Sequence, residues 1–142
     1  DAKSLHEFTL ERLPSEYVAN LRRKEQVHSF LEGSCKAGSQ WGVCGILFTD
    51  KFDTSPALKS LSFRYRDRVA FGEVRGKNDA LAQAYFVLSQ PQLIFFCGGD
   101  GAVTFPYEGE LRGEALDRFV KGLRDGSKCK DAELAHSEKK QK

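Results

Sequence analysis

The sequence is poor in several features that would assign a class at once. It has no methionine, one tryptophan, four prolines and four cysteines among 142 residues. No apolar run approaches the ~18 residues of a membrane helix, so direct insertion into a membrane is not expected. The first ten residues, DAKSLHEFTL, lack a signal-peptide pattern, and without an initiating methionine we expect a mature or trimmed end.

The cysteines are too few for a disulfide-built scaffold and form no C-x-x-C pair. No histidine lies near any of them in the sequence, and the three histidines are far apart along the chain. A zinc site needs several such ligands at short spacing, so we expect no metal and no cofactor. The four cysteines are Cys35, Cys44, Cys97 and Cys129.

The charge is unevenly placed. The net charge is +2, and residues 121–142 carry seven Lys/Arg against four Asp/Glu, which leaves the rest of the chain almost neutral. A nucleic-acid binder concentrates cations on its folded surface, so nucleic acid is not an expected partner. We predict an N-terminal lead (1–15), one folded domain (16–124) and a basic, flexible C-terminal tail (125–142).

What the sequence does contain is an ordinary globular composition, 40% hydrophobic and 30% charged. Its apolar periodicities alternate between strand and helix, in the order β-α-β-α-β-α-β-β-α. This order predicts a single α/β domain with helices packed on a central sheet. The predicted strands are 16–21, 41–48, 68–76, 92–97 and 102–110, with a GGDG turn joining the last two, and the predicted helices are 24–33, 56–65, 78–88 and 113–123.

The stretch GILFTDKFDTSPALKSLSFRY (45–65) is the most informative. An apolar strand runs into a short polar loop, and a helix opens directly after it. Ser55 suits the N-cap of that helix and Pro56 its first position. The loop therefore joins a buried strand to a helix N-terminus, a common place for a functional site.

This order, with the proline of SQPQLIFF just before the fourth strand, resembles the thioredoxin fold from about Glu16 to Leu123. The resemblance implies an α/β, thioredoxin-like fold with a central mixed β-sheet and helices on both faces. In that family the loop after the buried strand carries Cys-x-x-Cys, preceded by an aromatic residue and faced by a cis-proline. Here the aromatic is Phe52, the proline is Pro91, and the four motif positions fall on Asp53-Thr54-Ser55-Pro56.

The departure from this pattern decides the expected chemistry. Dithiol–disulfide exchange needs an attacking thiolate and a second thiol to resolve the mixed disulfide. Neither Asp53 nor Pro56 can supply one. The buried acid that assists proton transfer in the family would fall at Leu47, which cannot relay a proton. We therefore expect the usual redox activity to be absent and the chain not to be an enzyme.

The string FTDKFDTSPALKSLSFRYRDRVAFGEVR is similar to non-catalytic thioredoxin-like domains of the protein disulfide isomerase family and of endoplasmic-reticulum DnaJ-type proteins. This implies a protein-folding role in the secretory pathway. We expect a module that binds unfolded or extended polypeptide, or a neighbouring domain of a larger folding factor, by strand addition beside the proline. The predicted site comprises Phe52, Asp53, Thr54, Ser55, Gln90, Pro91 and Gln92.

In a thioredoxin-like topology the cysteines allow two pairings. Cys44 and Cys97 would be neighbours on antiparallel strands, although we favour two separate buried thiols, since a bridge within a strand pair strains disulfide geometry. Cys35 and Cys129 would share the end of the domain away from Pro91. A Cys35–Cys129 disulfide there is as compatible with the sequence as two independent surface thiols, and it would need an oxidising compartment.

Two other functions compete with binding. The chain would be an atypical thiol–disulfide oxidoreductase if Cys44 or Cys97 acted in place of the missing motif, although Cys44 lies in the middle of an apolar run. It would be a structural spacer if the loop and Pro91 only complete the fold. Rapid alkylation of a thiol in the folded protein would favour the first, and failure to bind any polypeptide would favour the second.

Overall fold

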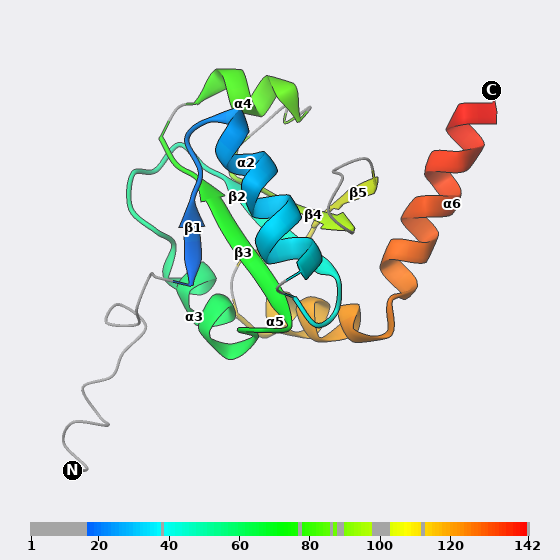
Figure 1. Ribbon diagram of the computed structural model, residues 1–142. Coiled ribbons are helices and arrows are strands. Elements are labelled where there is room, and N and C mark those ends of the chain that lie inside the picture. Colours follow the sequence, from blue (N-terminus) through cyan, green and yellow to red (C-terminus); the bar gives the residue numbers. More distant parts are fainter. Residues whose placement is uncertain are drawn as a thin grey trace, which may run out of the picture.

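The computed structural model describes residues 17–37, 39–76, 78–85, 87, 90–97, 103–111 and 113–141. A five-stranded sheet runs through the middle of the molecule, with the order β1-β3-β2-β4-β5 (Figure 1). β1 and β2 each pair with β3 in parallel, whereas β4 runs antiparallel to β2 and to β5. The strands are β1 (Val18–Asn20), β2 (Val43–Phe48), β3 (Val69–Val74), β4 (Gln92–Cys97) and β5 (Val103–Pro106).

Helices cover both faces of the sheet. Side chains of α2 (Lys24–Phe30), of the π-helical turn η2 (Leu31–Ala37) and of α4 (Asp79–Ala84) pack on one face. Side chains of α3 (Pro56–Arg64), α5 (Gly113–Lys121) and the 3₁₀ turn η3 (Gly122–Asp125) pack on the other. Every residue of β2 is buried, which explains why its sequence is a continuous apolar run.

Alternation along the strands decides which face each side chain meets. In β2, Val43 and Leu47 point to the α3/α5 face, while Cys44, Ile46 and Phe48 point to the α2/α4 face. We call these the α3 face and the α2 face. An aromatic group formed by Phe95, Phe105, Tyr107 and Phe119 joins β4 and β5 to α5 on the α3 face.

The predicted order of elements is confirmed, with shorter bounds for most of them. Pro56 opens α3 as predicted, and Asn78 caps α4 by accepting a hydrogen bond from the Leu81 N–H at 3.3 Å. Ser55 occupies the N-cap position of α3, but its side chain makes no cap hydrogen bond. The GGDG turn (98–101) and the N-terminal lead (1–15) lie outside the described residues.

The C-terminal segment is helical, which the sequence analysis did not predict, while the flexibility of this tail stays a prediction. Residues Ser127–Gln141 form the helix α6, which lies beside β5 (Figure 1). Gly126, with φ of 76°, makes the turn that separates α6 from η3. The helix was missed because its polar residues show no apolar stripe, so its sequence alone resembles a solvated end.

Among the described residues, no helix has both the length and the apolar character needed to cross a bilayer.

Candidate functional site

The candidate site lies at the end of the sheet where β1, β2 and β3 end and β4 begins. We call it the loop end. Its central feature is the loop of residues 49–55, which joins β2 to α3. The Thr49 N–H donates to the Val74 carbonyl at 3.0 Å, and the Gly76 N–H donates to the Lys51 carbonyl at 2.8 Å. These two bonds fix the first half of the loop to the end of β3.

Phe52 projects from this loop into solvent, with 80% of its surface exposed. Its carbonyl accepts a hydrogen bond from Arg75 Nη1 at 3.0 Å, so the backbone beneath the ring is held in place. The ring lies against Gly76, where an added Cβ would stand 3.1 Å from it. Gly76 also has a φ of 70°, a conformation that other residues adopt only with strain. An exposed aromatic ring on a fixed backbone is a common feature of binding surfaces.

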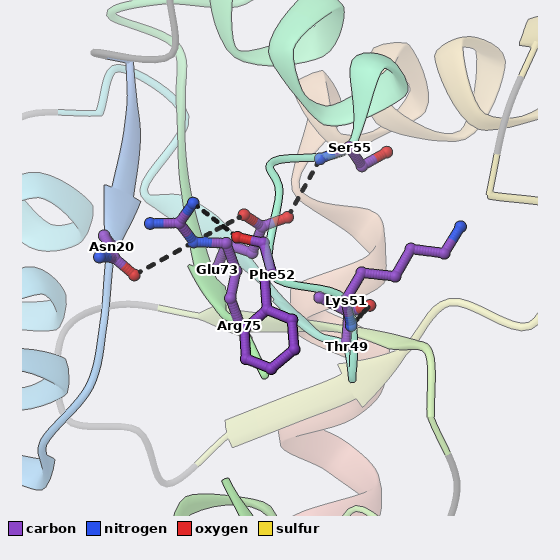
Figure 2. A network of polar contacts seen from close by, with 7 residues as sticks. All are labelled: Asn20, Thr49, Lys51, Phe52, Ser55, Glu73 and Arg75. Atoms are coloured by element: carbon purple, nitrogen blue, oxygen red, sulfur yellow. Dashed lines mark hydrogen bonds and ion pairs between the residues drawn. The ribbon is translucent and has the colours of Figure 1, made fainter. Parts of the chain in front are cut away.

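Beneath the loop lies a buried acid that the sequence reading missed. Glu73, on β3, is fully buried, and its Oε2 accepts the Ser55 N–H at 3.3 Å (Figure 2). Its Oε1 lies 3.5 Å from Arg75 Nε as an ion pair. That Oε1 has no hydrogen-bond partner among the described residues. Glu73 thus connects the helix start at Ser55 to the guanidinium that holds Phe52.

Burial raises the pKa of the Glu73 carboxyl above its ordinary value. The Ser55 N–H, the Thr54 side chain and the nearby cations of Arg75 and Lys59 counteract this rise only in part. The fold therefore favours the protonated carboxyl more than solvent does. If the proton sat on Oε1, this buried oxygen would become an O–H group that can donate a hydrogen bond.

Glu73 stands next to the position where the resemblance placed the family's buried acid. It pairs in register with Leu47, and the two side chains share the α3 face. Leu47 itself is apolar, as the sequence predicts, but the neighbouring strand supplies a carboxyl in its place. A signal was available in the sequence: Glu73 is the one charged residue inside VAFGEV, an otherwise buried strand.

The proline edge lies at the same end, on the other side of β2. The Gln90–Pro91 peptide is cis, and Gln92 pairs with Phe48, the last residue of β2. On its other side, β4 begins its ladder with β5 only at Ile94, after the Tyr107 N–H donates to the Leu93 carbonyl at 2.9 Å. Within the described part of the chain, the backbone of residues 90–92 has no partner strand on that side. An extended peptide could pair there.

The structure brings only part of the predicted site together. Thr54 and Ser55 gather on Glu73, whereas Asp53 is exposed and makes no hydrogen bond or ion pair with any described residue. Phe52 leans toward β3, and β3 lies on the opposite side of β2 from β4 and Pro91. The loop and residues 90–92 therefore share one end of the sheet, with the ring of Phe52 turned to the far side.

A pocket of about 540 Å³ opens beside the loop, between α3 and α5. Its walls include Ser55, Pro56, Leu111 and Leu116. At its rim Arg64 Nη1 donates to Asp117 Oδ1 at 2.7 Å, and the Tyr65 hydroxyl donates to the same oxygen at 2.9 Å. The pocket offers an apolar side chain a place next to the helix start.

All four cysteines lie at the opposite end of the sheet, which we call the disulfide end. Cys35 is bonded to Cys44 and Cys97 to Cys129, with Cα–Cα distances of 5.3 and 5.7 Å. Cys35 and Cys44 are fully buried on the α2 face. Cys97 is 7% exposed, and the partly exposed Cys129 joins α6 to the α3 face.

These disulfides correct the predicted cysteine states. The Cys35–Cys129 disulfide considered in the sequence analysis does not form. Both residues lie at the expected end, but the sheet separates them, because Cys35 packs on the α2 face and Cys129 on the α3 face. Cys44 and Cys97 are not bonded to each other, because Cys44 pairs with Phe96 and the one-residue offset points the two sulfurs to opposite faces. The expectation that these two are free thiols is also wrong.

No group of three potential metal-ligating side chains comes together among the described residues.

No protein-family model matches the chain. A protein of Dictyostelium discoideum named "Putative protein disulfide-isomerase" is 26% identical over 119 residues. The match covers 84% of this chain and 27% of that protein, so the chain spans about a quarter of the relative's length. The resemblance to protein disulfide isomerases is thus supported by similarity to a relative with that name.

Solved structures confirm the fold. The J-Trx1 fragment of ERdj5 has a TM-score of 0.56 and 19% identity over 76% of this chain and 52% of its own. Human ERp44 in a zinc-bound form has a TM-score of 0.56 and 18% identity over 74% of this chain and 29% of its own. Chloroplastic thioredoxin z has a TM-score of 0.57 and 13% identity over 76% of this chain and 95% of its own. The chain has a thioredoxin-like fold, with a mixed sheet and helices on both faces.

Proposed function

We propose that this chain is a redox-inactive thioredoxin-like module that binds unfolded or extended polypeptide, as part of a larger folding factor in the secretory pathway. One observation carries the proposal. The loop that would hold a reactive cysteine pair has none, and all four cysteines are bonded in pairs at the other end of the sheet. The loop end keeps an exposed aromatic ring, an open backbone edge and a pocket.

The site has no group for the usual exchange reaction. A thiolate must attack a client sulfur, and a second thiol must then release the client. Asp53 and Pro56 occupy the two motif positions, and neither carries sulfur. Glu73 could hold a proton beneath the loop, but no thiol of the described loop is there to exchange it. Its contacts to Ser55 and Arg75 instead support a positioning role.

The same end suits non-covalent binding. The backbone beside Pro91 would pair with an extended client, and the pocket between α3 and α5 would take one of its apolar side chains. A neighbouring domain of the same factor is the alternative occupant, and binding measurements with and without that domain distinguish the two.

The two disulfides favour an oxidising compartment, as found in the endoplasmic reticulum lumen. The similarity to a relative named as a protein disulfide-isomerase supports the same placement.

Equilibrium binding of a fluorescent, unfolded polypeptide with all cysteines carbamidomethylated tests the proposal. We expect saturable binding that weakens about tenfold in Phe52→Ala, because an exposed aromatic anchor contributes a large share of such affinity. Leu134→Ala is the matched control, because Leu134 is 65% exposed but lies on α6. Equal loss in both variants, or no binding at all, would refute the proposal and leave a spacer role.

An oxidoreductase remains the second candidate, because one disulfide is accessible: Cys129 is partly exposed. A client thiolate would attack Cys129 Sγ and release the Cys97 thiolate. A second client thiolate would then attack the client sulfur of the mixed disulfide and release the Cys129 thiolate. The client gains a disulfide, and Cys97 and Cys129 remain in this chain as two reduced thiols. Cys44 cannot act in this way, because it and Cys35 are fully buried. Client oxidation abolished by Cys97→Ala/Cys129→Ala would favour this function.

A further inference from the structure

A second groove lies at the loop end, on the side of β2 away from Pro91. It measures about 680 Å³ and is lined by the ends of β1 and β3, the loop and the start of α4. We call it the Phe52 groove. Its lining includes Asn20, Arg22, Phe52, Arg75, Gly76 and Asn78. Two of these residues are cations and none is an acid.

Arg75 is held in a fixed orientation within this groove. Its Nη1 donates to the Phe52 carbonyl at 3.0 Å, and its Nε donates to Asn20 Oδ1 at 3.3 Å (Figure 2). No described residue accepts from its Nη2. The side chain is 27% exposed, so solvent or a ligand can reach it. A guanidinium held on one edge and open on the other favours a carboxylate.

Among the described residues, the acid that forms an ion pair with Arg75 is Glu73, which lies behind it in the core. Burial raises the pKa of Glu73, so this neighbour is more readily neutral than an exposed acid. Whenever Glu73 is protonated, the Arg75 charge faces the groove without a partner.

Arg22 adds a second cation on an ordered backbone. Its N–H donates to Gln26 Oε1 at 2.8 Å, and its carbonyl accepts from Asn78 Nδ2 at 3.1 Å. The side chain is exposed and forms no ion pair with the described residues. The groove therefore combines two cations with the exposed ring of Phe52.

We propose that the Phe52 groove binds an extended, acidic segment of a client polypeptide, with the carboxylate of an Asp or Glu on Arg22 and Arg75 and a neighbouring apolar side chain on Phe52. This inference rests on the proposed polypeptide binding and specifies its sequence preference. Charge complementarity carries it, since a neutral or basic segment would leave Arg22 without an acidic partner and Arg75 with only the buried Glu73. Phe52 supplies the apolar half of the contact.

Fluorescence anisotropy of the full chain with designed peptides tests the preference. One probe is a cysteine-free 12-residue peptide in which Phe and Asp residues alternate and are separated from each other by Gly or Ser spacers. The second probe replaces every Asp by Asn. Both carry acetylated and amidated ends, so that any carboxylate comes from side chains alone. We expect the Asp peptide to bind about threefold to tenfold more tightly in low salt, with the difference shrinking as salt rises.

The variants separate a local contact from general attraction. Arg22→Gln should remove most of the preference for the Asp peptide and leave the Asn peptide unchanged. Arg124→Gln is the matched control, since Arg124 is exposed on η3, outside the groove. Equal effects of the two variants would overturn the proposal in favour of unspecific charge. Equal affinity of the two peptides would overturn it while leaving polypeptide binding intact, and no binding of either peptide or of the unfolded polypeptide would refute both.

Discussion

The two ends of the sheet are built in different ways. At the disulfide end, two covalent bonds tie the sheet to η2 on one face and to α6 on the other. At the loop end, hydrogen bonds and one ion pair around Glu73 and Arg75 hold the loop. The disulfide end buries three of its four cysteines, whereas the loop end exposes Phe52 and leaves the backbone of residues 90–92 unpaired on one side.

This contrast reverses the arrangement that the thioredoxin resemblance implies. There, sulfur chemistry belongs to the loop between the buried strand and the helix. Here, both disulfides lie at the far end of the sheet, and the loop keeps a polar network without sulfur. Under the proposed function this difference separates two tasks: the disulfide end would supply stability, and the loop end would bind polypeptide. Removing groups at each end should therefore change different properties.

Removing the buried disulfide should have the largest effect on stability. The nine-residue separation of Cys35 and Cys44 gives about 2.5 kcal/mol by loop entropy, and the loss of two buried sulfurs adds about 1–2 kcal/mol. We expect Cys35→Ala/Cys44→Ala to lower the free energy of unfolding by about 4 kcal/mol in urea titrations. Unchanged stability would show that this end is not what holds the domain together.

Removing the second disulfide should cost nearly as much. The separation of 32 residues gives about 3.7 kcal/mol by the same entropy estimate, and less packing is lost than at the first disulfide, because Cys97 is buried but Cys129 is partly exposed. We expect Cys97→Ala/Cys129→Ala to show this loss in urea titrations with unchanged polypeptide affinity. A parallel loss of affinity would mean that the two ends are coupled or that this disulfide takes part in function.

A change at the loop end should affect both conformation and binding, on a smaller scale. Gly76→Ala introduces a residue at φ of 70° and places its Cβ 3.1 Å from the Phe52 ring. We expect a loss of about 1–2 kcal/mol in unfolding free energy and weaker polypeptide binding. Gly33→Ala is the control, because a Cβ there meets nothing within 4 Å. Unchanged binding in Gly76→Ala would show that the contact between the Phe52 ring and Gly76 does not contribute to polypeptide binding.

The smallest expected effect is a change in the pH dependence of stability. The pKa of Glu73 is raised in the fold above its unfolded value of 4.5. Its stabilising contribution is therefore complete below that value and is lost as the pH rises through the folded pKa. Glu73→Gln cannot titrate, so its stability relative to wild type should be higher at pH 8 than at pH 4.

Urea titrations at pH 4, 6 and 8 measure this slope, with the exposed Glu114→Gln as control. If the relative stability of Glu73→Gln instead fell with pH, the charged carboxyl would be the form that the fold favours, and the ion pair with Arg75 would outweigh burial.

Local patterns in the sequence predicted the fold well. The apolar run of β2, Pro56 at the start of α3 and Asn78 at the cap of α4 each depend on near neighbours in the chain. The site was only partly predictable, because its geometry depends on the register between strands. Glu73 acquires its position only when β3 aligns beside Leu47.

The disulfides show the same limit most clearly. The thioredoxin-like topology placed Cys35 and Cys129 at the end away from Pro91 and Cys44 and Cys97 on neighbouring strands, but pairing depends on which face of the sheet each sulfur meets. A shift of one residue between β2 and β4 would exchange the faces of one strand relative to the other. The direction in which Phe52 leans is also not local, since it depends on Gly76 and Arg75 at the end of β3.

The most direct test of the account compares two forms of one unfolded polypeptide, with free thiols and with all thiols carbamidomethylated, for binding to the full chain. The account predicts equal, saturable affinity for both forms and no covalent adduct on non-reducing gels, because recognition occurs at the sulfur-free loop end. Binding that requires client thiols, or a mixed disulfide with Cys97 or Cys129, would contradict it.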